Sequence, residues 1–135
     1  MPFCKADPAL GARVNVVGTV NLLEAAAAHA PGTTFAYASS VAAYGADDEP
    51  TVDGRAGADP QGRPRTLYGV FKRANEETAA VYADDRGLAS IGLRPFVVYG
   101  VGRDQGLTSS PTAAMLAAAA GRPAHIPYGG RCLYH

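Results

Sequence analysis

A tyrosine and a lysine stand four positions apart in the stretch Tyr68-Gly69-Val70-Phe71-Lys72. In a helix such residues lie one above the other on the same face, so Tyr68 and Lys72 would present a phenol and an ammonium to one ligand. A phenol titrates at about pH 10, and a neighbouring positive charge favours the phenolate, which makes it a better base near neutral pH. The spacing often arises by chance, and two solvent-facing side chains are the simpler interpretation. The surrounding chain therefore has to support any chemical role.

Two long helices are predicted around this pair. Asp7-Pro8 is a typical helix start, and the helix is predicted to run over residues 7–29 until Pro31-Gly32 ends it. Its apolar residues form two stripes, which predicts packing on two sides: Leu10, Val14 and Val17 form one stripe, and Val16, Val20, Leu23 and Ala27 form the other. A second helix is predicted over residues 67–86, with Gly87 as a left-handed C-cap. Its predicted inner face contains Val70, Phe71, Ala74, Thr78, Val81 and Tyr82.

Short apolar stretches alternate with these helices. Residues 35–38 and 89–94 are predicted strands, and a third helix is predicted over residues 112–120. This alternation predicts a parallel sheet with right-handed crossovers, which binds ligands at the carboxyl ends of its strands. The Asp-, Pro- and Gly-containing segment 46–66 is predicted to be a long surface loop. Two strands, or three with residues 124–127, are few for such a sheet, so we expect this chain to be part of a larger one.

Composition and charge limit the class of protein. The chain of 135 residues is 47% apolar, and its 12 basic and 12 acidic residues give a formal net charge of zero. This predicts one globular domain and argues against a non-specific nucleic-acid binder or a membrane-surface protein. Without a basic-then-apolar N-terminal signal, a cytoplasmic location is expected. The Cys and His residues have no metal-ligand spacing, so no metal site is predicted.

Several motifs follow one another in a fixed order along the chain. They are Asn15 to Asn21 at the start, Ser39-Ser40 followed by Tyr44-Gly45, Tyr68 to Lys72 beginning 28 positions after Ser40, Leu93-Arg94-Pro95-Phe96 followed by Tyr99-Gly100, and Gly121-Arg122-Pro123 followed by Tyr128-Gly129-Gly130. In this order, and over nearly the whole chain, they resemble the extended short-chain dehydrogenase/reductases, the NAD-dependent epimerase/dehydratase family. The resemblance implies an α/β fold, here a partial Rossmann-like doubly wound parallel sheet with flanking helices.

The resemblance also implies roles for individual residues. Tyr68 would be the acid/base that moves the substrate hydroxyl proton, Lys72 would hold the cofactor ribose and lower the phenol pKa, and Ser40 would hydrogen-bond the reacting oxygen. Asn15 would be tied to the proton relay, with packing of its amide within the helix as the open alternative. The implied cofactor is NAD, with NADP not excluded.

The implied cofactor contacts extend into the last strand. Pro95, Phe96 and Val98 would pass near the nicotinamide, mainly through their backbone. Arg103, in a turn of the substrate-side region, could meet an anionic substrate, with solvent exposure as the alternative, and Ser40 is the other candidate substrate contact. The glycines around it, at positions 100, 102 and 106, have the wrong spacing for a dinucleotide loop and predict a turn.

Three departures from the family pattern shape the prediction. Val97 stands where nucleotide-sugar epimerases often have asparagine, which argues against a UDP-sugar substrate. Ser40-Val41-Ala42 replaces the Thr-Asp-Glu of sugar-nucleotide dehydratases, which argues against dehydratase chemistry. Residues 1–38 contain no glycine-rich turn of the form that cradles a pyrophosphate. We therefore expect residues 1–135 to form a single incomplete NAD(P)-binding domain, an internal fragment whose substrate-side region begins at about residue 101.

Together these observations predict an NAD-dependent sugar or sugar-acid epimerase or dehydrogenase. The family resemblance implies a homodimer through the helices at 7–29 and 67–86, and the two-striped first helix agrees with that expectation. The alternative is a non-catalytic truncated remnant that acts only as a folded interaction module and retains Tyr68 and Lys72 by descent.

Overall fold

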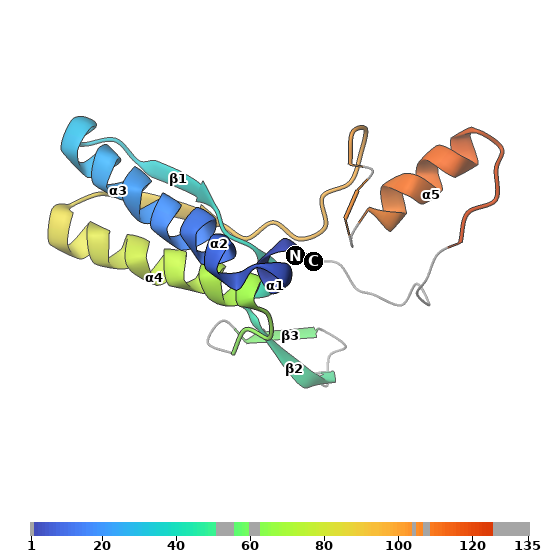
Figure 1. Cartoon of the computed structure of the whole chain (residues 1–135), viewed down its shortest axis with the longest axis horizontal. Helices are drawn as coiled ribbons and strands as arrows, with labels where there is room; N and C mark the ends of the chain where they lie inside the picture. The colour runs from blue at the N-terminus through green and yellow to red at the C-terminus, as the bar shows by residue number, and fades with distance from the viewer. Residues whose placement is uncertain (1, 51–55, 60–62, 104, 107–108, 126–135) are drawn as a thin grey trace. The chain divides into compact units, whose positions relative to one another are not determined.

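The computed structural model describes residues 2–50, 56–59, 63–103, 105–106 and 109–125 and contains two compact units, Met1–Pro95 and Phe96–His135 (Figure 1). The boundary lies a few residues before the predicted start of the substrate-side region, and the single-domain interpretation stays a prediction. The elements of the first unit are α1 (Pro2–Ala6), α2 (Pro8–Ala12), the π-helical turn η1 (Arg13–Val17), α3 (Gly18–His29), β1 (Phe35–Ala38), the 3-10 turn η2 (Val41–Ala43), β2 (Gly45–Pro50), β3 (Ala56–Asp59), α4 (Leu67–Arg86) and β4 (Ser90–Leu93). The second unit contains α5 (Ser110–Ala119).

The first long helix is continuous from α2 through η1 to α3, as predicted. Asp7 caps its start, where the carboxylate Oδ1 accepts a hydrogen bond from the Leu10 N–H at 2.9 Å. A side-chain acceptor at this position satisfies one of the N–H groups that a helix start leaves without an intrahelical partner. The turn at Arg13–Val17 widens to π geometry around Asn15. Such single π turns occur often at functional sites. The short helix α1 was not predicted.

Strands β1 and β4 pair in parallel, with Phe35 opposite Ser90 and Ala38 opposite Leu93, which confirms the predicted parallel sheet. In Figure 1, α3 and α4 lie side by side and both strands run behind them. The core of this layered unit consists of Leu23, Ala79 and Leu88, and Phe35 and Tyr37 of β1 pack against it. The helices therefore cover one face of the two-stranded sheet.

Helix α4 spans Leu67–Arg86, the predicted range. Thr66 caps it by accepting the Gly69 N–H at 3.0 Å, and Gly87 ends it with φ +65°, the predicted left-handed C-cap. The predicted inner face was wrong at Val70 and Val81, whose side chains are exposed. The buried positions are instead Gly69, Asn75 and Ala79. At Gly69 the helix comes close to backbone, because a Cβ there would meet the Ala42 carbonyl oxygen of η2.

Two further boundaries differ from the predictions. The segment 46–66 is not only a loop, because β2 and β3 form an antiparallel pair with Gly45 opposite Asp59. Backbone hydrogen bonds make this ladder, so a composition rich in Asp and Pro did not reveal it. Helix α5 begins at Ser110, two residues before the predicted start, and Pro111 occupies its first turn. Of the predicted strand at 124–127, residues 124–125 have no regular structure and the rest lies outside the described residues.

Candidate active site

The carboxyl end of β1 is covered by the N-terminal half of α4. The ammonium Nζ of Lys72 donates a hydrogen bond to the Ala38 carbonyl oxygen at 2.8 Å. Ala38 is the last residue of β1, and Ser39 and Ser40 follow it directly. This one bond therefore places Lys72 at the edge where an open parallel sheet binds ligands.

Tyr68 and Lys72 share one face of α4, as their spacing predicts. The Lys72 Nζ lies 5.6 Å from the centroid of the Tyr68 ring. Both side chains are half-buried. Burial lowers the pKa of Lys72, because desolvation disfavours the charged form, and the nearby Cys4 acts in the opposite direction. The site thus combines a phenol with a partly desolvated ammonium.

Ser40 is the N-cap of the 3-10 turn η2, and its Oγ accepts a hydrogen bond from the Ala42 N–H at 3.2 Å. Helix α4 approaches this turn closely at Gly69. A Cβ on Gly69 would lie 2.1 Å from the Ala42 carbonyl oxygen, far inside van der Waals contact. Only glycine allows this approach, which brings the segments carrying Ser40 and Tyr68 together.

Asn15 belongs to the π turn of the first helix. Its Nδ2 donates to the Gly11 carbonyl at 2.9 Å and lies 3.8 Å from the Cys4 sulfur. Cys4 is buried and close enough to Lys72 to influence its pKa. These contacts agree with packing of the amide within the helix, the alternative left open by the sequence. A part in the proton relay stays a prediction.

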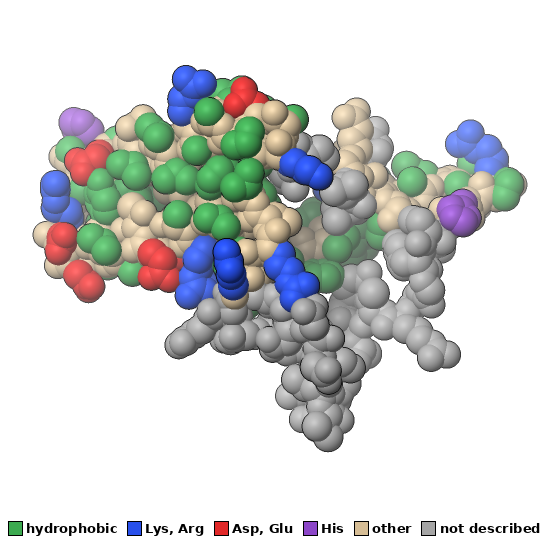
Figure 2. All heavy atoms as spheres, turned by 60° about the horizontal axis from the view of Figure 1, so that its bottom comes forward, with side chains coloured by type: hydrophobic (Ala, Val, Ile, Leu, Met, Phe, Trp, Pro, Cys, Tyr) green, Lys and Arg blue, Asp and Glu red, His purple; other side chains and the backbone are tan. Residues whose placement is uncertain are grey.

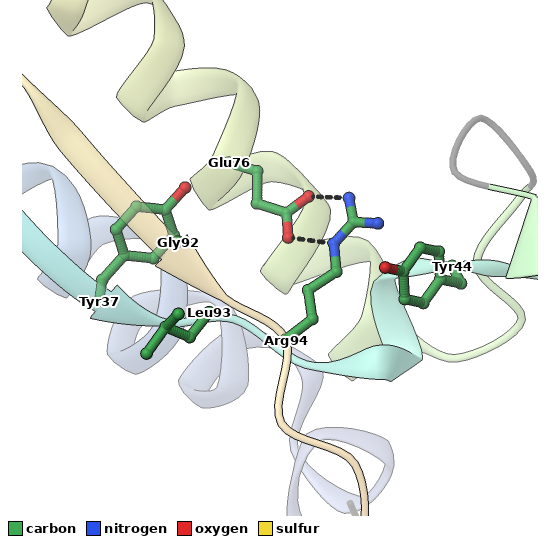
Figure 3. A pocket seen from close by; sticks show the side chains of 6 residues that line it. All are labelled: Tyr37, Tyr44, Glu76, Gly92, Leu93 and Arg94. Carbon is green, nitrogen blue, oxygen red and sulfur yellow. Dashed lines mark hydrogen bonds and ion pairs between the residues drawn. The ribbon is translucent and has the colours of Figure 1, made fainter. Parts of the chain in front are cut away.

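A network of polar side chains lies one helical turn beyond Lys72 (Figure 3). The Arg94 guanidinium, just after β4, makes two bonds to the Glu76 carboxylate, at 2.7 Å from Nε to Oε1 and 2.5 Å from Nη2 to Oε2. The Ser39 hydroxyl also donates to Glu76 Oε1. On its other side, Arg94 lies over the Tyr44 ring, 4.2 Å from the centroid. The hydrogen bond from Arg94 is the main reason that the pKa of Glu76 is lowered.

This network borders a pocket of about 540 Å³, lined by Tyr37, Tyr44, Glu76, Gly92, Leu93 and Arg94. Neither Tyr68 nor Lys72 belongs to the lining, so the hollow and the phenol–ammonium pair are neighbouring features of the same sheet edge. The pKa of Tyr37 is raised, first by burial and then by Glu76. In the pocket, the Arg94 guanidinium and the Glu76 carboxylate already satisfy each other, and a catalytic role for Tyr68, Lys72 and Ser40 stays a prediction.

The predicted cofactor and substrate residues near the C-terminal end fall into both units. In the first unit, the Pro95 carbonyl accepts the Val41 N–H at 3.3 Å and so lies against η2. In the second unit, Phe96 and Val98 have exposed side chains. Arg103 donates from its guanidinium to the Gln105 carbonyl within a turn, and its own N–H bonds to the Gly100 carbonyl at 3.0 Å. The turn predicted from the glycines is confirmed, and the substrate role of Arg103 stays a prediction.

Sequence reasoning missed two parts of this site. The close approach at Gly69 had only one signal, a glycine inside an otherwise regular helix. The sequence signal for the Glu76–Arg94 pair was a glutamate four positions after Lys72 and thus on the same helix face. Within the described part of the chain, no group of His, Cys, Asp or Glu side chains is arranged to hold a metal ion, and no described helix is long and apolar enough to cross a membrane.

Comparison with known proteins found similar chains. The model of the NAD dependent epimerase/dehydratase family matches residues 2–132. UDP-glucuronate 4-epimerase 6 of Arabidopsis thaliana is 41% identical over 86 residues, which are 64% of this chain and 18% of that protein. The GalE-like L-threonine dehydrogenase from Cupriavidus necator, in its holo form, aligns with a TM-score of 0.73 and 26% identity over 90% of this chain and 38% of that one. The Thermus thermophilus UDP-glucose 4-epimerase in complex with NAD aligns with a TM-score of 0.62 and 27% identity over 89% of this chain and 38% of that one. The chain thus spans about a fifth of the curated relative's length.

Proposed function

Since this chain belongs to the NAD-dependent epimerase/dehydratase family, we propose that it carries the proton-transfer and ribose-binding residues of an enzyme that oxidises a carbinol carbon of a sugar or sugar acid. The observation that carries the proposal is the hydrogen bond from Lys72 to the last carbonyl of β1. It holds an ammonium and, one turn away, the Tyr68 phenol at the ligand-binding edge of a parallel sheet, beside Ser40.

The residues present fit the ribose and nicotinamide end of a dinucleotide. An ammonium has three N–H donors, so the bond from Lys72 to the Ala38 carbonyl is compatible with further bonds to the two hydroxyls of a ribose. The backbone that follows β4 at Pro95 lies against η2, next to Ser40. NAD is the proposed cofactor, as in the complex of the Thermus thermophilus epimerase, and NADP is to be tested beside it. When bound, the oxidised nicotinamide supplies the hydride acceptor.

Three side chains perform the proton transfer. The Tyr68 oxygen takes the proton of the substrate hydroxyl, while the two electrons of the adjacent C–H bond leave as hydride, so the carbinol becomes a carbonyl. The ammonium of Lys72, 5.6 Å from the centroid of the Tyr68 ring, would hold the cofactor ribose beside the phenol. Ser40 accepts the Ala42 N–H, so its own hydroxyl proton can be donated to the reacting oxygen. An epimerase returns the hydride to the other face, and a dehydrogenase releases the ketone or lactone.

The names of the relatives narrow the proposed substrate. The Arabidopsis protein is named for UDP-glucuronate, which is a sugar acid carried on a nucleotide. Val97, by contrast, stands where nucleotide-sugar epimerases often have an asparagine that contacts the substrate diphosphate, and valine cannot make that contact. We therefore propose a sugar-acid substrate and take UDP-glucuronate as the first compound to test, with free glucuronate as its comparison.

A homodimer is also proposed, through the long helix 7–29 and α4. Side chains on the outer side of both helices are apolar and exposed, and Figure 2 shows hydrophobic side chains in rows over this helix pair. Val14 and Val17 of one predicted stripe are 59% and 50% exposed, whereas Leu23 of the other is fully buried. A contiguous apolar surface of this kind is typical of an interface. The exposed members are Leu10, Val14, Val17, Leu22, Val70 and Val81.

Tyr68→Phe tests the proposed function. The variant keeps the ring and removes the hydroxyl, so we expect turnover of UDP-glucuronate with NAD to fall by at least about a hundredfold. The thermal shift caused by NAD should remain, because Lys72 is unchanged. Near wild-type turnover in the variant contradicts the role of Tyr68. Absence of an NAD-dependent shift both in the wild-type chain and in a version extended upstream through a glycine-rich turn supports the non-catalytic interpretation instead.

A further inference from the structure

We propose that Glu76 and Arg94 are positioning residues that hold the Ser40 segment against the Tyr68–Lys72 face of α4. The inference rests on the proposed function for its catalytic consequence, but its structural part stands on contacts alone. The described elements meet here at one point: the ends of β1 and β4, the N-terminal half of α4 and the turn η2. The Glu76–Arg94 pair with Ser39 and Tyr44 is called the clamp below.

Two consecutive turns of α4 are joined to the end of β1, the first by Lys72 and the second by Glu76 of the clamp. Lys72 donates to the Ala38 carbonyl, and one helical turn later Glu76 accepts from the Ser39 hydroxyl. Ser39 is buried, with 3% of its surface exposed, and its N–H bonds to the Leu93 carbonyl at 2.6 Å. Because Ser39 directly precedes Ser40, its fixed position defines where the chain leaves the strand.

Arg94 fixes the other end of the same segment. Its guanidinium is held by both oxygens of Glu76 and stacks on the Tyr44 ring. Tyr44 is the C-cap of η2. The turn that begins at Ser40 is therefore anchored on both sides, by Ser39 before it and by Tyr44 after it. Both anchors lead to the same carboxylate, since Arg94 connects Tyr44 to Glu76 (Figure 3).

The clamp differs from the ion pair beside it on α4. The side chains of Arg94 and Glu76 are 21% and 15% exposed and make two parallel hydrogen bonds. Arg73 and Glu77, also on α4, are 27% and 67% exposed and make an i,i+4 pair at 2.9 Å. A two-pronged pair with little exposure fixes geometry, whereas an exposed pair contributes little. Removing one partner of the clamp leaves a poorly solvated charge, so its effect should concentrate at the elements that the clamp joins.

Amide hydrogen exchange on the chain itself tests the positioning. We compare Glu76→Gln with the matched control Glu77→Gln, which removes the neighbouring carboxylate. In Glu76→Gln we expect protection of the N–H groups of Ala43 and Tyr44 to fall by about tenfold or more, while amides of α3 around Leu23 change little. Glu77→Gln should leave both regions unchanged. Wild-type protection at Ala43 and Tyr44 in Glu76→Gln overturns the inference.

A second variant covers the case in which Glu76→Gln unfolds. Arg94→Lys keeps the charge but loses the two-pronged bond and the planar stack on Tyr44, so it should loosen η2 selectively. Full protection in Arg94→Lys, or equal loss across α3 and η2 in both variants, overturns the inference. The latter result would identify the pair as a general stability element.

Enzyme kinetics test whether the clamp also affects catalysis. If the wild-type chain turns over UDP-glucuronate, Arg94→Lys should lower kcat by about tenfold or more with KM nearly unchanged, because a displacement near 1 Å costs up to about a hundredfold. The positioning role is contradicted if Glu77→Gln lowers kcat as much as Arg94→Lys does, or if Arg94→Lys changes only KM. If the wild-type chain has no turnover, the proposed function fails, while the exchange experiment still decides whether the clamp holds Ser40.

Discussion

Replacing Gly69 with alanine should destabilise the chain, although alanine favours helices. Gly69 lies in α4 between Tyr68 and Val70, and its φ is not among the positive values. Alanine is therefore compatible with the backbone, and only the neighbouring turn opposes it. A Cβ would meet the Ala42 carbonyl oxygen at 2.1 Å and the Pro64 Cβ at 3.2 Å. The first contact is with backbone, which cannot rotate away as a side chain can.

The expected magnitude follows from two opposing effects. Alanine in place of glycine in a helix gains up to about 1 kcal/mol in free energy of unfolding. Relieving the contact requires a shift of roughly 1 Å between α4 and η2, and such overpacking costs about 1–3 kcal/mol. The contact is severe, so we expect a net loss of about 1–2 kcal/mol. The same shift would separate Tyr68 from Ser40, so any turnover should also fall.

Gly18→Ala is the matched control. Gly18 has helical dihedral angles, φ −59° and ψ −40°, and its Cβ would meet nothing closer than the Arg13 carbonyl at 3.7 Å. This substitution should stabilise by about 0.5–1 kcal/mol. Urea unfolding followed by circular dichroism measures both variants. If Gly69→Ala stabilises the chain as Gly18→Ala does, the close approach of α4 to η2 is wrong, and with it the proximity of Ser40 to Tyr68.

Two further predictions concern single groups. The pKa of Glu76 is lowered, first by the hydrogen bond from Arg94. The stability that this carboxylate contributes is therefore present above the unfolded pKa of about 4.3 and is lost as the pH falls through the folded pKa. Glu76→Gln should flatten the acid side of a plot of unfolding free energy against pH, and an unchanged slope would count against the Glu76–Arg94 pair. Gly87 ends α4 with φ +65°, so Gly87→Ala should lower the unfolding free energy by about 1 kcal/mol and Gly87→Asn by less, whereas equal losses for both would argue against a left-handed cap.

The sequence by itself located the two long helices, the parallel strand pair and the two side chains for which chemistry is proposed. Asp7-Pro8, Gly87 and the apolar periodicity located the two long helices, because caps and helical spacing are local properties. The four-residue spacing placed Tyr68 and Lys72 on one face for the same reason. Alternation of helices and strands also predicted the parallel pairing of residues 35–38 with the following strand, which the structure confirms.

Only the tertiary structure decided which surfaces meet. The inner face of α4 was predicted from its apolar residues, yet Val70 and Val81 are exposed and Gly69 is buried. Hydrophobicity indicates that a side chain prefers burial but not which neighbour comes close, and at a strand end the neighbour is backbone. The clamp between Glu76 and Arg94 joins residues 18 positions apart. Such contacts depend on the packing of separate elements, so the local sequence pattern could suggest Tyr68 and Lys72 but not the close approach of α4 to η2.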